Sequence, residues 1–207
     1  MIMKLIILGA FATGKGTQAA KLADHLGLQR ISTGDMFREE IRKRSDIGLK
    51  VKGILDRGDL VPDDLTVKIL KERLPKESFI LDGFPRTVRQ AEELGKIRNI
   101  DLVINLDVTK EEIVRRATGR LTCRAAGHIY HEIYEPPKDP GKCDIDGSDL
   151  YKREDQKPEA VESRFQAYEK NTKPLIEYYQ RKGLLVNVNG MGTPDEVFNR
   201  ILIVLKG

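Results

Sequence analysis

A lysine follows a glycine-rich stretch near the beginning of this 207-residue chain. Residues 9–17 read Gly-Ala-Phe-Ala-Thr-Gly-Lys-Gly-Thr, so that Lys15 ends a Gly-x4-Gly-Lys spacing. In such a loop, successive backbone N–H groups point at an anion, and the helix that follows adds partial positive charge at its N-terminus. The lysine supplies a mobile ammonium group. The spacing therefore predicts a phosphate-binding loop (P-loop).

Gly16 stands directly after Lys15, where loops of this pattern usually carry Ser or Thr. A hydroxyl at that position normally binds Mg²⁺, and the nearest hydroxyl here belongs to Thr17, one place later. We therefore expect no direct bond between the loop and the metal. The alternative, a tight strand-to-helix turn that binds nothing, is disfavoured because the flanking strand and helix of a P-loop are both indicated.

An aspartate ends a second apolar run. Residues 79–82 are Phe-Ile-Leu-Asp, and Gly-Phe-Pro-Arg follows. Ligands of open α/β sheets bind at the carboxyl ends of the strands, which would place Asp82 on the Mg²⁺ side of a bound nucleotide. A lone aspartate after a strand is often a turn former. Its combination with a P-loop favours the metal-side acid, and Pro85 would aim Arg86 in a defined direction.

Several arginines lie in polar segments and are candidates for phosphate binding: Arg38, Arg86, Arg120, Arg153 and Arg164. Planar guanidinium groups bind phosphate oxygens bidentately, and phosphoryl transfer spreads its charge over such oxygens. No histidine or carboxylate stands in an evident position for an attacking base. None is needed if the acceptor is itself a phosphate, which is anionic at neutral pH. The residues thus predict phosphoryl transfer to a phosphate.

Alternating strands and helices must position these side chains. Short apolar runs predict buried strands at 3–8, 28–31, 79–82, 101–107 and 184–188. Helical spacing is expected at 18–26, 32–44, 48–57, 62–75, 109–120 and 158–182, with an interruption at 171–174, and again from about 193. Ser32 or Thr33 would cap one helix and Thr109 another. The alternation predicts an α/β fold with a doubly wound, mainly parallel sheet.

The pattern changes between 121 and about 156. This stretch contains paired prolines, glycines, the alternating residues Tyr130, His131 and Tyr134, and both cysteines of the chain, Cys123 and Cys143. It has little helical periodicity and therefore predicts a small β-rich insertion.

Composition limits the function classes. The chain is 40% hydrophobic and 33% charged, and no apolar stretch approaches the roughly 20 residues of a membrane span. The first apolar run leads straight into the P-loop, so we expect no signal peptide, and two cysteines suit a reducing, cytoplasmic setting. A net charge of +4 would suit a basic nucleic-acid-binding protein. That alternative is disfavoured because Trp is absent and the aromatic residues fit core or lid positions.

Several motifs together resemble the adenylate kinase family: Gly-Lys-Gly-Thr at 14–17, Ser-Thr-Gly-Asp-Met at 32–36, Phe-Ile-Leu-Asp-Gly-Phe-Pro-Arg at 79–86 with Gln90, and the lid-like insertion. The resemblance runs essentially end to end, and Asp-Gly-Phe-Pro-Arg is highly specific to nucleoside monophosphate kinases. It implies the reaction Mg·ATP + AMP ⇌ 2 ADP in a monomer. It also implies three parts: a core at 1–31, 62–118 and 157–207, a helical AMP-binding segment at 32–61, and a lid at 119–156.

The resemblance further implies site residues. The ATP phosphates would be bound by Ala12, Thr13, Gly14, Lys15, Gly16 and Thr17, and the ATP base side would be lined by Arg120, Ile129, Tyr130 and Gly192. AMP would be bound by Thr33, Arg38, Asp59, Leu60, Val61, Gly83, Phe84, Pro85, Arg86 and Gln90, together with Arg153 and Arg164. The catalytic set would be Lys15, Arg86, Arg120, Arg153 and Arg164, with Asp82 holding the water shell of Mg²⁺. Asp155 would pair with lid arginines.

Two departures from the family pattern concern the loop and the end of the lid. The family loop usually reads Gly-Ala-Pro-Gly-Ala-Gly-Lys, whereas Phe11, Ala12 and Thr13 stand here. If the middle position needs a positive φ, Ala12 costs roughly 1 kcal/mol. Gln156 replaces an acid that is common beside Asp155.

A third departure concerns metal binding in the lid. Cys123, Cys143 and Asp146 match three positions of the family's four-ligand zinc pattern, and Ala126 occupies the fourth. His128 or a water could complete a tetrahedron; a lid held by packing with two free thiols, or a disulfide, are the other possibilities. Because structural zinc sites normally have four protein ligands, we expect a metal-free or weakly metallated lid.

Three alternative activities share parts of this pattern. A pyrimidine (UMP/CMP) monophosphate kinase is the nearest, but Thr33 and Gln90 favour adenine as the acceptor base. A GTP:AMP phosphotransferase stays open because the sequence does not distinguish the donor. A GTPase or motor-type NTPase would be expected to show an Asn-Lys-x-Asp motif and a switch threonine, and neither is evident.

Overall fold

A central parallel sheet organises the molecule, for which a computed structural model describes residues 3–206. The strands follow the order β2-β3-β1-β4-β8. Their bounds are β1 Lys4–Leu8, β2 Gln29–Ser32, β3 Phe79–Asp82, β4 Leu102–Asp107 and β8 Leu185–Asn189. Every pairing between them is parallel. The predicted α/β fold with a mainly parallel sheet is confirmed.

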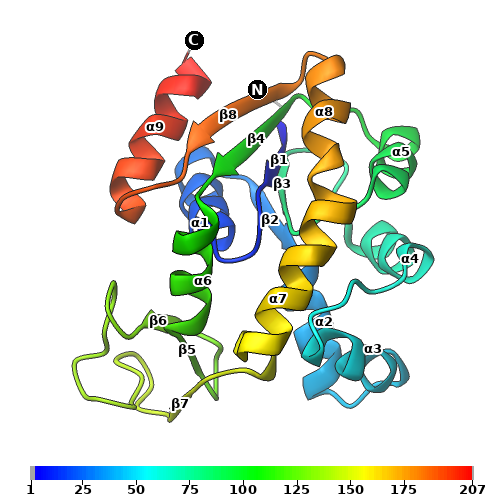
Figure 1. Ribbon diagram of the computed structural model, residues 1–207. Helices are drawn as coiled ribbons and strands as arrows, with labels where there is room; N and C mark the ends of the chain where they lie inside the picture. The colour runs from blue at the N-terminus through cyan, green and yellow to red at the C-terminus, as the bar shows by residue number, and fades with distance from the viewer. Residues whose placement is uncertain (1–2, 207) are drawn as a thin grey trace.

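Helices cover both faces of this sheet (Figure 1). They are α1 Lys15–Leu26, α2 Thr33–Arg42, α3 Asp46–Asp56, α4 Asp63–Arg73, α5 Val88–Ile97, α6 Lys110–Thr118, α7 Pro158–Ala167, α8 Pro174–Arg181 and α9 Pro194–Lys206. Along β1, Leu5 and Ile7 pack in the core with α1 and α9. Ile6 and Leu8 belong to the other core, with α2, α4, α5 and α8. This alternation explains why β1 has no polar residue after Lys4, since both of its faces are buried.

The predicted β-rich insertion is a separate small antiparallel sheet of order β6-β5-β7, below α6 in Figure 1. Its strands are β5 Arg120–Cys123, β6 Ile129–His131 and β7 Leu150–Tyr151. Cys123, Tyr130 and Cys143 form a small apolar core of their own there.

Two helix caps are those that the sequence predicts. The Ser32 hydroxyl accepts a hydrogen bond from the Asp35 N–H at 3.3 Å, and the Thr109 hydroxyl accepts one from the Glu112 N–H at 3.4 Å. The third helix begins at Asp46, two residues before the predicted Gly48, because Ser45 caps it.

The interruption expected at 171–174 is present only as a change of helix type. Residues Tyr168–Thr172 form a π-helical turn, with the Lys173 N–H bonded to the Tyr168 carbonyl at 2.9 Å. Pro174, which has no N–H, is the first residue of α8. In Figure 1, α7 and α8 therefore run on as one long rod along the sheet. Within residues 3–206, no helix is long and apolar enough to cross a membrane.

Candidate active site

The P-loop connects β1 to α1 through a strongly curved backbone. Gly9 and Gly14 have φ values of 137° and 91°, and Ala12 has φ 57°. A side-chain carbon at Gly9 would lie 2.8 Å from the Leu106 carbonyl oxygen, so glycine is needed there. The middle position does require a positive φ, and the cost of about 1 kcal/mol expected for Ala12 applies.

Lys15 begins α1 and turns its ammonium back into the loop, where it donates to the Ala10 carbonyl. Burial lowers its pKa from 10.5 to about 7; Arg86, Arg164 and Arg120 act in the same direction, and Asp82 opposes them. A lysine with such a low pKa among three arginines marks a strongly cationic cleft. The loop is thus suited to bind a highly charged phosphate chain.

The arginines around this cleft are themselves desolvated. Burial lowers the pKa of Arg164 to about 9 and that of Arg120 to about 10. The Arg164 guanidinium lies 4.5 Å from the centre of the Phe11 ring, so one residue that departs from the family loop supports an arginine of the site.

Asp155 joins two of the predicted arginines. Its carboxylate accepts from Arg153 Nε at 2.9 Å and from Arg164 Nη1 at 2.8 Å. Burial acts to raise the pKa of Asp155, but the two guanidinium groups outweigh it and the pKa is lowered. The expected pairing with a lid arginine is therefore present for Arg153, while Arg164 belongs to α7.

Asp82 ends β3 beneath the start of α1. A side-chain carbon at Gly16 would lie 3.4 Å from Asp82 Oδ2, so the carboxylate is adjacent to the P-loop. This buried oxygen donor beside a phosphate site fits a water-mediated contact with Mg²⁺.

Sequence reasoning missed Arg30, which contacts Asp82. Arg30 Nη2 donates to Asp82 Oδ2 at 2.7 Å, and Nη1 lies 3.1 Å from Asp35 Oδ2. Asp35 in turn binds Arg38 at 2.5 Å. Arg30 and Asp82 point to the same side of the sheet because β2 pairs with β3 in the register Arg30–Ile80 and Ser32–Asp82. That register could not be read from the sequence.

The structure brings several predicted AMP residues together at the end of β3. The Gly83 carbonyl accepts from Thr33 Oγ1 at 2.8 Å and from Arg86 Nε at 2.9 Å. The Arg86 N–H donates to Gln90 Oε1 at 2.7 Å. Phe84 is a core side chain, so a contact with AMP there would use its backbone.

The stretch 59–61 reaches the same region from α3. Asp59 accepts from Ser163 Oγ on α7 at 3.4 Å, and Val61 is buried. At Gly58, a side-chain carbon would lie 2.6 Å from Arg164 Cγ, which shows how tightly this stretch packs on α7.

The residues predicted for the ATP base side are not gathered in this way. Ile129 is exposed on β6, and Tyr130 uses its hydroxyl within the lid, accepting from the Asp144 N–H at 2.8 Å. Within residues 3–206, no hydrogen bond joins either one to Gly192. A second missed residue, Arg116 on α6, donates to the carbonyls of Gly190 and Gly192 at 3.1 and 3.5 Å.

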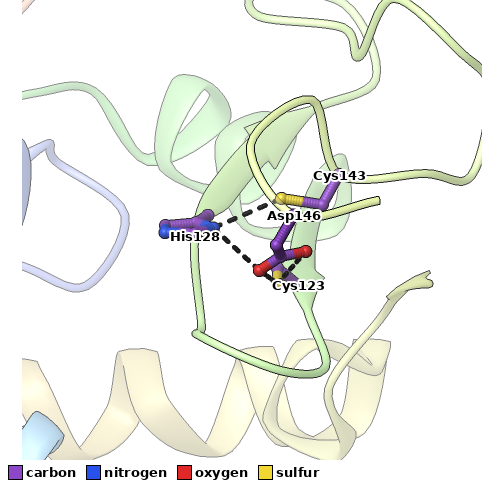
Figure 2. A group of neighbouring side chains, drawn as sticks. All are labelled: Cys123, His128, Cys143 and Asp146. Carbon is purple, nitrogen blue, oxygen red and sulfur yellow. Dashed lines mark hydrogen bonds and ion pairs between the residues drawn. The ribbon is translucent and has the colours of Figure 1, made fainter. Parts of the chain in front are cut away.

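The lid gathers four possible metal ligands, shown in Figure 2. One ligand atom from each of Cys123, His128, Cys143 and Asp146 lies within 4.8 Å of the others. His128 Nδ1 is 3.2 Å from Cys143 Sγ, and Cys123 Sγ is 3.2 Å from Asp146 Oδ2. The fourth donor near the predicted three is thus His128.

Two thiols, an imidazole and a carboxylate are donors that a tetrahedral zinc ion accepts. Burial acts to raise the pKa of the Cys123 thiol, but hydrogen bonds with Ser148 and the Ala126 N–H outweigh it and lower the pKa to about 7. Both cysteines are free, so the disulfide alternative is wrong in this structure.

Comparisons with known proteins agree with this geometry. A family model described as adenylate kinase matches residues 7–184. A protein of Listeria monocytogenes named adenylate kinase is 49% identical over 205 residues, which cover 95% of each chain. Proteins with the same name from Staphylococcus epidermidis and Archaeoglobus fulgidus are 47% and 46% identical, over 98% and 99% of this chain and 99% and 98% of their own.

Proposed function

The chain belongs to the adenylate kinase family, and from that premise we propose that it transfers the γ-phosphoryl group of Mg·ATP reversibly to AMP, giving two ADP. One observation carries the proposal: Lys15 shares the P-loop cleft with Arg86, Arg120 and Arg164, and burial and these charges lower its pKa to about 7. Such a cleft holds more positive charge than one phosphate group needs, which supports two phosphate chains meeting there.

On the donor side, the P-loop N–H groups and Lys15 bind the ATP phosphates in this proposal. Asp82 holds water molecules of the Mg²⁺ shell, and Mg²⁺ supplies positive charge to the donor phosphates when bound. Gly16 leaves the carboxylate access to the loop, because a longer side chain there would meet Asp82 and Arg30.

On the acceptor side, Thr33, Gln90 and the stretch 59–61 bind AMP, and Arg38 and Arg86 bind its phosphate. Thr33 and Arg86 bond to the Gly83 carbonyl and Arg38 pairs with Asp35, so these side chains are held before the nucleotide arrives. The acceptor phosphate is already anionic, and the arginines stabilise the charge that passes between the two nucleotides.

The three parts are proposed to act as a core, an AMP-binding segment at 32–61 and a lid at 119–156. Closure of the lid over ATP would exclude water, which otherwise competes as an acceptor of the phosphoryl group. Two free cysteines support a reducing compartment, and we propose the cytoplasm.

A coupled assay tests the activity. Purified protein is given ATP or GTP as donor and AMP, CMP, UMP or GMP as acceptor, and ADP formation is followed. We expect ATP with AMP to give the highest kcat/KM. A higher value with CMP or UMP would make the protein a pyrimidine monophosphate kinase, and a higher value with GTP would make it a GTP:AMP phosphotransferase.

A further inference from the structure

Two adjacent acidic residues in the first turn of α4 have different surroundings. Asp63 contacts the beginning of α5: its Oδ2 accepts from Thr87 Oγ1 at 2.8 Å, and its Oδ1 accepts from Gln90 Nε2 at 2.7 Å. Asp64 is 84% exposed at its side chain and pairs with Arg89 at the surface. A helix N-terminus favours both acids equally, so the contacts of Asp63 need another explanation.

Gln90 is 2% exposed, and both ends of its amide are bound. The oxygen accepts from the Arg86 N–H at 2.7 Å, while the nitrogen donates to Asp63. A backbone N–H can only donate, and a carboxylate can only accept. A half-turn of the amide would set oxygen against carboxylate and N–H against N–H. Asp63 and the Arg86 N–H therefore hold the Gln90 amide in one orientation.

The bound amide keeps one N–H and one oxygen lone pair unused. Adenine offers a donor, its 6-amino group, next to an acceptor, its ring N1, and this pair matches an amide oxygen next to an amide N–H. A 6-oxo purine offers the opposite pair, an acceptor O6 next to a donor N1–H. It would need the amide turned round, which leaves buried polar groups unpaired.

We propose that Asp63 is a specificity-determining residue that fixes the Gln90 amide so that the acceptor site takes 6-amino purines and rejects 6-oxo purines. The inference rests on the proposed function, because it assumes that Gln90 faces the base of AMP. Asp63 itself acts through Gln90 and is a positioning residue.

The test compares Asp63→Asn with the matched control Asp64→Asn. The Asp63→Asn change keeps the size of the side chain but lets it donate as well as accept, so either orientation of Gln90 is tolerated. We measure kcat/KM for AMP and for IMP with ATP as donor, and KM for ATP. The AMP-to-IMP ratio should fall roughly tenfold in Asp63→Asn, about what one mispaired hydrogen bond supplies. The ratio in Asp64→Asn and the KM for ATP in both variants should match the wild type.

An unchanged AMP-to-IMP ratio in folded Asp63→Asn would overturn the inference. If thermal melting shows that this variant does not fold, Thr87→Val takes its place, because it frees the carboxylate from its anchor on α5. The ratio should then fall several-fold, and an unchanged ratio overturns the inference equally. Failure of the proposed function is distinguishable, since wild-type protein would then not phosphorylate AMP at all.

Discussion

Lys15 concentrates the chemistry of the site in one residue. Its ammonium is buried beside a backbone carbonyl and shares the cleft with Arg86, Arg120 and Arg164. Burial and these positive charges disfavour its charged form, so the free protein carries the lysine at a cost. A bound phosphate chain would remove that cost. The residue thus links nucleotide binding to protonation.

Replacing Lys15 by Met should abolish phosphoryl transfer and leave the fold intact, because the lost contacts are to phosphate. We expect less than about a tenth of wild-type kcat, in line with the loss of one preorganised electrostatic contact. Lys21→Met on the same helix, which loses a surface ion pair with Asp195, is the matched control and should keep its activity. Turnover above that level in folded Lys15→Met would rule out the assigned role.

Binding of ATP at pH 8 should take up a proton. With a pKa of about 7 in the free protein, Lys15 is mostly neutral at pH 8, and a triphosphate beside it raises that pKa. Calorimetry in two buffers of different ionisation enthalpy should give an uptake of about one proton per site. The uptake should vanish in Lys15→Met and persist in Lys21→Met. Equal binding heats in the two buffers for wild-type protein would contradict the prediction.

At the scale of the elements, the π-helical turn between α7 and α8 is tied to the site. Thr172 lies in that turn, and its hydroxyl donates to the Arg86 carbonyl at 2.9 Å. The extra residue of a π turn shifts the side chains that follow it around the helix axis, which brings a polar group to this loop. The sequence showed only an irregular stretch before Pro174. Its contact with Arg86 depends on packing between elements 86 residues apart.

The small lid sheet should bind zinc weakly. Its four donors include two thiols, whereas the tighter structural sites use three or four thiolates. We expect well under one zinc per chain after dialysis against a chelator, measured by elemental analysis. Zinc added back should raise the melting temperature, and His128→Ala should remove that rise.

His25→Ala, which alters a distant histidine on α1 beside Phe198, should respond to zinc as the wild type does. One full equivalent of zinc retained through chelator dialysis would show the lid to be a tight structural site instead.

At the scale of the whole molecule, both segments proposed to move meet at α7. Arg164 on this helix is bound to Asp155 next to the lid, and its stem lies against Gly58 at the end of α3. Arg153 on the lid side shares the same carboxylate. A nucleotide phosphate that competes for these arginines would therefore affect both segments at once.

Closure predicts a pattern of hydrogen exchange. A bisubstrate analogue that joins ATP to AMP should slow amide exchange across 119–156 and across 32–61, because both segments would pack over the ligand. Exchange in β1 and β4, which are buried on both faces, should change little. Unchanged exchange in 119–156 and 32–61, with the analogue bound, would contradict closure.

The sequence by itself determined the features that depend on near neighbours. The strand, glycine loop and helix around Lys15, the buried strand ending at Asp82, and the caps Ser32 and Thr109 are confirmed where they were predicted. These follow from hydrophobic periodicity and from hydrogen bonds between residues three or four positions apart. A positive φ at Ala12 was likewise foreseeable from the loop pattern.

The tertiary structure alone decided the contacts that depend on register and packing. Arg30 meets Asp82 across 52 residues, and Asp63 meets Gln90 across 27. His128 joins Cys143 because a turn between β5 and β6 folds it toward a loop 15 residues away. Residue type shows that such a side chain can bind a partner. Which partner it meets is set by how strands align and helices pack, and that information is spread over the whole chain.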